Sequence, residues 1–183
     1  MKKKCLIFTW SGFQDHEVVY PYYRLLGEGF EVSIVGDQKD EKGRFYGIFG
    51  LNMPCHLIYS EFYLNAQQWM TDADLIILPG GVKSLEKLRL EKKVIKFIKE
   101  WNEKNKLISS TCHGAQLLIS SKVTKDKNIS GYYSLEDDII NSGANYVNEP
   151  VVVDDNIVTS PHYDHMGIWM EETIKIFYSR NKN

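Results

Sequence analysis

Cys112 is the residue best placed to act as a nucleophile. It ends an apolar run, Leu107–Thr111, and is followed at once by His113, Gly114 and a segment of helical character. A strand end holds the backbone, Gly114 permits a tight turn, and the free N–H groups and dipole at a helix start favour the thiolate. This placement predicts a reactive thiol whose pKa is lowered. The alternative is a buried structural cysteine, which is the commoner state of a lone cysteine.

A pair of glycines, Gly80 and Gly81, follows a second apolar run, Asp74–Leu78. Two glycines after a buried strand allow the backbone to approach closely and can turn N–H groups into the same crevice as the nucleophile. We expect the N–H groups of Gly81 and His113 to form an oxyanion hole. The alternative is a simple turn at the exit of the strand.

Glu17 is the candidate acid. It lies after the first apolar run and begins a helical segment that continues to Leu25. An acid in the first turn of a helix ordinarily does no more than interact favourably with the helix dipole. The residues around Glu17 do not by themselves assign it another role.

Short apolar runs alternate with segments of helical period, which is typical of a parallel sheet covered on both faces. The sequence predicts strands at Cys5–Trp10, Glu31–Val35, Asp74–Leu78, Leu107–Thr111, Val151–Val153 and Ile157–Thr159. In such α/β sheets ligands bind at the carboxyl ends of the strands, which is where Cys112 lies.

Two segments have the pattern of amphipathic helices that cover a sheet. Apolar residues recur between Val94 and Trp101 at the spacing of one helix face, with charged residues on the other face, and Met166–Phe177 repeats the pattern. Between the strands, Gly43–Tyr59 combines glycines and a proline with aromatic residues and predicts a hairpin or an irregular excursion.

Composition predicts a single domain over residues 1–183, because 43% of the residues are apolar and 25% are charged. The net charge is −2, from 22 basic and 24 acidic residues that are intermixed, so no nucleic-acid partner is indicated. The first apolar stretch is too short for a signal peptide, and no run is long enough to span a membrane. Three cysteines without CxxC spacing favour neither disulfides nor zinc and indicate a reducing, cytoplasmic location.

Taken together, these motifs resemble the ThiJ/PfpI family of the class I glutamine-amidotransferase-like superfamily, and most closely its PfpI branch, once described as intracellular cysteine peptidases. The resemblance is carried by Phe13–Leu25 (FQDHEVVYPYYRL), Asp74–Gly81 (DLIILPGG), Leu85–Leu90, Thr111–Ile119 (TCHGAQLLI), Gly131–Val147 and Val151–Ser160. It implies a flavodoxin-like three-layer α/β sandwich with a mostly parallel central sheet, no cofactor or metal, and a homo-oligomer of two or more chains.

The resemblance also implies catalytic roles. Cys112 is the nucleophile, and Glu17, held protonated, donates a hydrogen bond to its sulfur. His113 accompanies the nucleophile, and Gly81 and His113 supply the oxyanion-binding N–H groups. Glu86 aligns, with an offset of one residue, with an acid of the family that reaches the site from a neighbouring subunit. A neutral Glu17 is required because an ionised carboxylate would oppose a thiolate beside it.

The chain departs from its relatives after Ser160, where Pro161–Met166 replaces the usual arginine and turn. We expect this segment at the rim of the site, with His162 or His165 as an additional proton carrier that alters substrate choice. The alternative is that Asp164 caps the last helix and the histidines face solvent.

Two other interpretations concern neighbouring side chains. Tyr132 is a candidate for the rim of the site, where it could contact substrate. The alternative is that its ring only packs against neighbouring side chains. A metal site of His162, Asp164, His165 and His16 is not supported by any ligand spacing.

The expected substrate is a small carbonyl compound or a peptide. Addition of the thiolate to an aldehyde leads to cofactor-free glyoxalase or deglycase chemistry, which we favour, because an amide leaving group needs a well-placed acid. The alternatives are an intracellular cysteine peptidase or hydrolase and a non-enzymatic redox sensor or stress chaperone in which Cys112 is oxidised.

Overall fold

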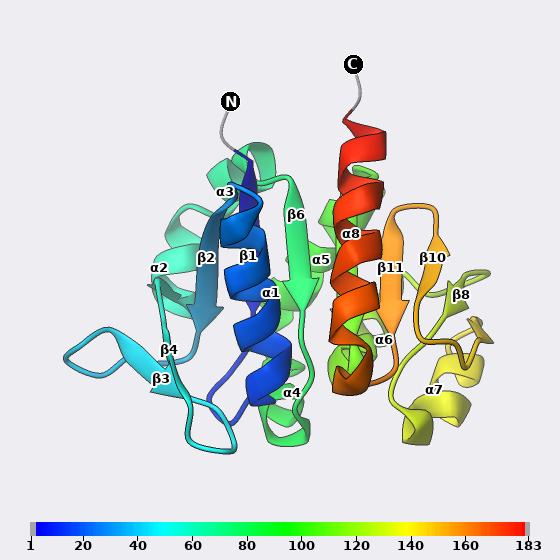
Figure 1. Ribbon diagram of the computed structural model, residues 1–183, viewed down its shortest axis with the longest axis horizontal. Coiled ribbons are helices and arrows are strands. Elements are labelled where there is room, and N and C mark those ends of the chain that lie inside the picture. Colours follow the sequence, from blue (N-terminus) through cyan, green and yellow to red (C-terminus); the bar gives the residue numbers. More distant parts are fainter. Residues whose placement is uncertain (1–2, 182–183) are drawn as a thin grey trace.

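A seven-stranded sheet forms the centre of the chain, which is described over residues 3–181 by a computed structural model (Figure 1). In spatial order its strands are β10 (Val152–Asp154), β11 (Ile157–Ser160), β7 (Leu107–Thr111), β6 (Leu75–Leu78), β1 (Lys4–Phe8), β2 (Glu31–Gly36) and β5 (Leu57–Ile58). Neighbouring strands are parallel except β10 with β11. The predicted mostly parallel sheet is confirmed.

Helices cover both faces of this sheet (Figure 1). One face packs against α1 (Asp15–Gly27) and α8 (Met166–Arg180), and the other packs against α2 (Tyr59–Leu64), α3 (Ala66–Asp72), α4 (Val82–Leu88), α5 (Lys92–Glu103), α6 (Ala115–Ser120) and α7 (Glu136–Asn141). The predicted three-layer sandwich is therefore confirmed. None of the helices within residues 3–181 has the length and apolar character needed to cross a membrane.

The two predicted amphipathic helices are present and bury the expected faces. In α5 the buried residues are Val94, Phe97, Ile98 and Trp101, and the Trp101 indole donates a hydrogen bond to the Leu107 carbonyl at 3.0 Å. The buried face of α8 consists of Met166, Trp169, Met170, Thr173, Ile174 and Phe177. Burial of these apolar stripes holds the helices on the sheet.

Several short elements lie outside the central sheet and its covering helices. An antiparallel hairpin, β3 (Arg44–Tyr46) with β4 (Asn52–Pro54), lies in the predicted excursion. A parallel pair, β8 (Asn128–Ile129) with β9 (Asn145–Tyr146), and three 3₁₀ turns, Cys112–Gly114, Tyr133–Leu135 and Tyr163–His165, complete the elements of the described chain.

Some predicted strand ends are wrong. β1 ends at Phe8 and not at Trp10, because the Trp10 N–H donates to the Ser84 hydroxyl at 3.0 Å and its ring stacks on Tyr59 with 5.5 Å between centroids. Side-chain partners thus draw Trp10 out of the sheet.

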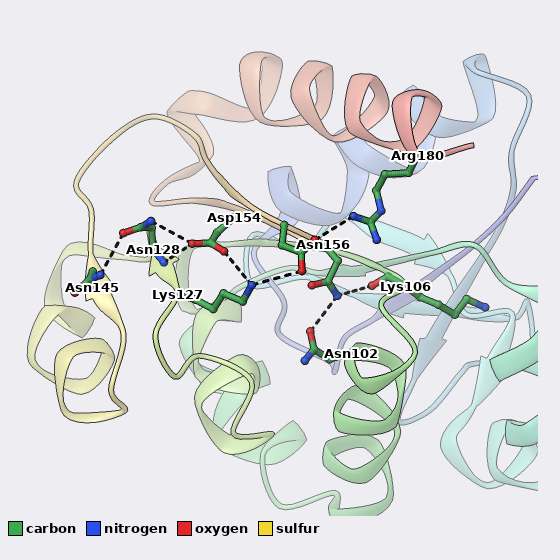
Figure 2. A network of polar contacts seen from close by, with 9 residues as sticks. Asn102, Lys106, Lys127, Asn128, Asn145, Asp154, Asn156 and Arg180 are labelled. Atoms are coloured by element: carbon green, nitrogen blue, oxygen red, sulfur yellow. Dashed lines mark hydrogen bonds and ion pairs between the residues drawn. The ribbon is translucent and has the colours of Figure 1, made fainter. Parts of the chain in front are cut away.

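A polar network fixes the amino-terminal edge of the sheet (Figure 2). Asp154, the last residue of β10, forms an ion pair with Lys127 at 3.0 Å. Asp155, in the β10–β11 turn, lies 3.6 Å from Lys127 Nζ and 3.4 Å from Arg180 Nη1. The buried Asn156 amide donates to the Lys106 carbonyl at 2.9 Å. This edge lies opposite the strand ends that carry the candidate residues.

The carboxyl ends of β1, β6, β7 and β11 meet at one edge because these strands are parallel. The loops that leave them carry Glu17, the glycine pair, Cys112 and the Pro161–Met166 segment. The topology therefore brings the predicted motifs together.

Candidate active site

Cys112 occupies a tight bend between β7 and α6. Its backbone has a φ of +57°, in the left-handed region that an L-residue rarely adopts, and its side chain is only 6% exposed. Gly114 is required two residues later, because a Cβ there would lie 2.1 Å from the Leu78 carbonyl oxygen. The end of β6 thus presses against the bend and fixes the position of the sulfur.

His113 turns its ring toward the sulfur. Its Nδ1 lies 3.3 Å from Cys112 Sγ, and the ring stacks on Tyr132 with 4.6 Å between centroids and 27° between planes. Tyr132 is itself held by a hydrogen bond from its N–H to the Cys112 carbonyl at 3.2 Å. Burial lowers the pKa of His113, so at neutral pH the imidazole is uncharged and able to accept a proton.

Glu17 reaches the same point from the first turn of α1. It is fully buried, and its Oε2 accepts the Gly80 N–H at 2.6 Å, whereas Oε1 has no hydrogen-bond partner. Burial raises the pKa of Glu17 to about 7, against the lowering effects of the Gly80 N–H and of the Cys112 thiol beside it. At neutral pH the carboxyl is therefore protonated in about half of the molecules, and the protonated acid implied by the family resemblance is one of its two populated states.

The backbone N–H groups of His113 and Gly81 lower the pKa of the Cys112 thiol. Gly81 has a φ of +107°, and a Cβ at this position would lie 2.7 Å from the Gln14 nitrogen. Glycine is thus required by both conformation and space. The N–H pair that the sequence assigned to an oxyanion hole lies at the sulfur.

The predicted lowering of the Cys112 pKa is wrong in direction. Burial raises the pKa of this thiol above its ordinary value, and the charge of Glu17 raises it further. The N–H groups of His113 and Gly81 oppose this rise without outweighing it, and the helix that follows, α6, has only six residues. The sequence shows the helix end but not the burial, and burial dominates.

Aromatic side chains extend outward from His113. We define the aromatic rim as Tyr132, Tyr133, His162, Tyr163 and His16. Successive ring centroids lie 6.0 Å apart for Tyr132 and His162, 6.1 Å for Tyr133 and His162, 3.9 Å for His162 and Tyr163, and 5.0 Å for His16 and Tyr163. Three of these residues, Tyr133, Tyr163 and His16, are exposed.

His162 does not face solvent, and Asp164 does not cap the last helix. The His162 side chain is 17% exposed and caps the 3₁₀ turn, with Nδ1 3.3 Å from the Asp164 N–H and 3.1 Å from Asp164 Oδ2. The N-cap position of α8 is instead His165, whose side chain makes no capping hydrogen bond. His162 therefore lies among the rim rings, as one sequence interpretation expected, and His165 stands apart from them.

Glu86 is not brought to Cys112 within one chain. It lies on the exposed face of α4 and lines a surface hollow of about 480 Å³ with Arg89 and Leu90. The groups that shift the pKa of Cys112 do not include it. Its predicted contribution to the site of a neighbouring subunit stays a prediction.

Sequence reasoning missed the role of Gly80 and the extent of the aromatic rim. The Gly80 N–H donates a hydrogen bond to the Glu17 carboxyl. A Cβ at Gly80 would lie 2.7 Å from Glu17 Oε2 and 2.9 Å from Cys112 Cβ, so the position has no room for a side chain. The glycine pair was the available signal for this role, and Tyr163 beside His162 was the signal for the rim. Over residues 3–181, no three His, Cys, Asp or Glu side chains are grouped to hold a metal ion.

Comparison with known proteins places this geometry in a family. The DJ-1/PfpI family profile matches residues 3–176. Deglycase PfpI of Pyrococcus furiosus is 35% identical over 94% of this chain and 98% of its own. YraA of Bacillus subtilis, whose name assigns it provisionally as a cysteine protease, is 31% identical over 96% of this chain and 99% of its own.

A solved structure from Anabaena variabilis, a two-domain protein with DJ-1/ThiJ/PfpI-like and ferritin-like domains, superposes with a TM-score of 0.86 at 26% identity. The match covers 100% of this chain and 52% of that protein, so the chain spans about half of its length. The family profile and the identity to full-length relatives lead to one conclusion: this chain belongs to the DJ-1/PfpI family.

Proposed function

We propose that this DJ-1/PfpI-type cysteine enzyme acts on small reactive carbonyl compounds and their adducts. The observation that carries the proposal is the convergence of four groups on one sulfur. The neutral imidazole of His113 can accept the thiol proton, and the N–H groups of His113 and Gly81 lie at the sulfur. Glu17 is a buried acid whose pKa is raised to about 7. The deglycase name of the Pyrococcus relative supports this reading.

The first step is addition of Cys112 to an aldehyde carbon. Because burial raises the pKa of the thiol, the sulfur attacks as its proton passes to His113 Nδ1, 3.3 Å away. The carbonyl oxygen becomes an oxyanion that the N–H groups of Gly81 and His113 stabilise. A protonated Glu17 leaves no negative charge beside the reacting sulfur.

With a 2-oxoaldehyde such as methylglyoxal, the His113 imidazolium returns its proton to the oxyanion, and the neutral imidazole then moves a proton from the aldehyde carbon to the neighbouring carbon. The hemithioacetal becomes a thioester of a 2-hydroxy acid, and one water cleaves it to the acid and the free thiol. The sum is one 2-oxoaldehyde and one water giving one 2-hydroxy acid. No external oxidant or reductant is consumed.

Incubation with methylglyoxal tests the proposal. We expect many equivalents of lactate per chain, none from Cys112→Ser, and normal turnover from Cys55→Ser, which removes a buried thiol at another place. A single equivalent of covalent adduct without lactate would contradict an enzyme and favour the redox-sensor interpretation. Cleavage of unmodified peptides without lactate formation would instead support the peptidase alternative, to which the name of YraA points.

We further propose that the active unit is a homo-oligomer in which Glu86 reaches the site of a neighbouring chain. The exposure of Glu86 on α4 supports this placement, because an exposed acid is free to meet another surface. Light scattering at the assay concentration tests the assembly. A fully active monomer would remove Glu86 from the site.

A further inference from the structure

Four buried polar atoms behind the nucleophile have no hydrogen-bond partner among the protein atoms of residues 3–181. They are Thr111 Oγ1 on β7, Ser160 Oγ on β11, Trp169 Nε1 on α8 and Glu17 Oε1 on α1. Each of the four side chains is at most 1% exposed. Buried polar groups are almost always hydrogen-bonded, and a group left unpaired costs free energy.

Thr111 and Ser160 point toward the same helix. They are register partners on β7 and β11, and two residues earlier the partners are Ser109 and Val158. The Ser109 hydroxyl meets the Thr173 hydroxyl of α8 at 2.6 Å. Because side chains alternate along a strand, Thr111 lies on the same face as Ser109, and Ser160 lies beside it on that face.

Trp169 lies over these two hydroxyls. The helix α8 follows β11 through one 3₁₀ turn, so it starts at the carboxyl edge of the sheet and runs back across it. Trp169 precedes Thr173 by one helical turn, which is about 5.4 Å, and Thr111 follows Ser109 by about 6.6 Å of strand. Since Thr173 contacts Ser109, Trp169 is level with Thr111.

Glu17 reaches this layer from α1, which lies beside α8 over the same face of the sheet (Figure 1). Its two carboxyl oxygens differ in their surroundings. Oε2 accepts the Gly80 N–H at 2.6 Å and lies on the side of Cys112, because a Cβ at Gly80 would lie 2.7 Å from Oε2 and 2.9 Å from Cys112 Cβ. The unpartnered oxygen is Oε1, and the unpartnered hydroxyl of Thr111 directly precedes Cys112.

We infer that Thr111, Ser160 and Trp169, which we call the inner polar cluster, bind an internal water molecule that donates a hydrogen bond to Glu17 Oε1. The water thereby directs the acid proton to Oε2, beside Cys112. The water site rests on geometry alone, and its effect on catalysis rests on the proposed function. Register partners on neighbouring strands lie about 5 Å apart, a spacing that one water bridges between two short hydroxyls.

The donors and acceptors of the cluster match one water. The Trp169 N–H can only donate, so the water accepts from it and turns its own hydrogens away from the indole. One of these hydrogens goes to Glu17 Oε1 and the other to one hydroxyl oxygen, while the second hydroxyl donates to the water. All four unpartnered atoms are thereby satisfied. An oxygen that accepts from water is the carbonyl oxygen of a neutral carboxyl, which leaves the proton on the other oxygen.

A high-resolution crystal structure of the intact protein tests the site directly. We expect an ordered water within hydrogen-bond distance of Trp169 Nε1 and of Glu17 Oε1. A layer without water, or a direct hydrogen bond from the Trp169 indole to Glu17, would overturn the inference.

Thr111→Val keeps the shape of the side chain, removes its hydroxyl and gives a test by sign. In a dry cluster the loss of an unpaired buried hydroxyl would leave Tm unchanged or raise it. With a bound water we expect Tm to fall by about 2–4 °C, because the water loses a partner. The control is Ser110→Ala, on the opposite face of β7, where a Cβ at Gly114 would lie 2.7 Å from the Ser110 hydroxyl and the space is filled. The control should not lower Tm, and an unchanged or raised Tm in Thr111→Val would overturn the inference.

The contact with Glu17 is measured by carbon-13 NMR titration of its side-chain carboxyl. Loss of the water removes a donor to the ionised carboxylate, so Trp169→Phe and Ser160→Ala should each move the titration midpoint of Glu17 up by about one pH unit. The titratable neighbours of Glu17 stay in place in both variants: the Cys112 thiol beside it, and Asp15 and His16 on α1.

Trp101→Phe is the matched control for the indole. Trp101 is as fully buried as Trp169, but it lies on α5, and its N–H already donates to the Leu107 carbonyl at 3.0 Å. Its removal should leave the titration of Glu17 unchanged. An unmoved midpoint in both Trp169→Phe and Ser160→Ala would overturn the contact between the water and Glu17.

Turnover separates this inference from the proposed function. We expect Ser160→Ala to lower kcat for methylglyoxal about three- to tenfold with little change in KM, because the water orients the acid and does not touch the substrate. An unchanged kcat would overturn the role in catalysis. An ordered water and a shifted Glu17 titration in a parent protein that forms no lactate would overturn the proposed function and uphold the water site.

Discussion

Glu17→Gln keeps the shape of a buried side chain and removes its ability to ionise. Burial raises the pKa of Glu17 from 4.5 to about 7, so the folded chain holds this proton more tightly than the unfolded chain. The stability linked to the proton is fully present below about pH 4.5 and is lost as the pH rises through about 7. At 1.36 kcal/mol per pKa unit the whole shift corresponds to ~3 kcal/mol, of which ~2.4 kcal/mol falls between about pH 5 and about pH 7.5.

Urea unfolding of both proteins at those two pH values measures the effect. We expect the free energy of unfolding of the parent to fall by ~2 kcal/mol more than that of Glu17→Gln, since every other titrating group is shared. Glu86→Gln removes an exposed carboxylate and is the matched control. Parallel profiles for the parent and Glu17→Gln, within ~0.5 kcal/mol, would show that Glu17 is already ionised in the folded protein and would refute the neutral acid.

Three further outcomes are expected. Gly80→Ala should destabilise the fold by about 1–3 kcal/mol in thermal unfolding, because the new Cβ would lie 2.7 Å from Glu17 Oε2. The control is Gly27→Ala, whose Cβ would meet nothing within 4 Å and which should be neutral or mildly stabilising. Mass-spectrometric labelling with iodoacetamide should modify Cys112 faster than the other two cysteines, because Cys112 alone has an imidazole at 3.3 Å; slowest labelling of Cys112 would contradict this. His113→Ala should slow that labelling at neutral pH by at least about tenfold, and an unchanged rate would exclude His113 as the base.

The bounds of β7 and the bend that carries Cys112 were predictable because their signals are local. β7 has the predicted bounds, Leu107–Thr111, since five consecutive buried residues end in a glycine-containing bend. The helices with long apolar stripes were predictable for the same reason. Strands of two residues, such as β5, β8 and β9, lack a periodicity that a sequence can show.

Properties that depend on contacts between distant segments were not predictable. The pKa of Cys112 follows from its burial under several elements, and the sequence contains only the favourable helix start. Likewise the Gly80 N–H meets Glu17 across 63 positions of sequence, so Gly80 and Gly81 could not be assigned their separate partners. The orientation of His162 is set by rings from another loop, and a capping pattern alone pointed to solvent.

The left-handed backbone of Cys112 has a consequence for the engineering of this protein. An L-residue at a φ of +57° costs about 1–2 kcal/mol that glycine does not. A selection for thermal stability alone would therefore favour glycine at position 112 and eliminate the thiol in the same step. Activity and stability compete at this single residue, and any programme that improves one must hold the other under selection.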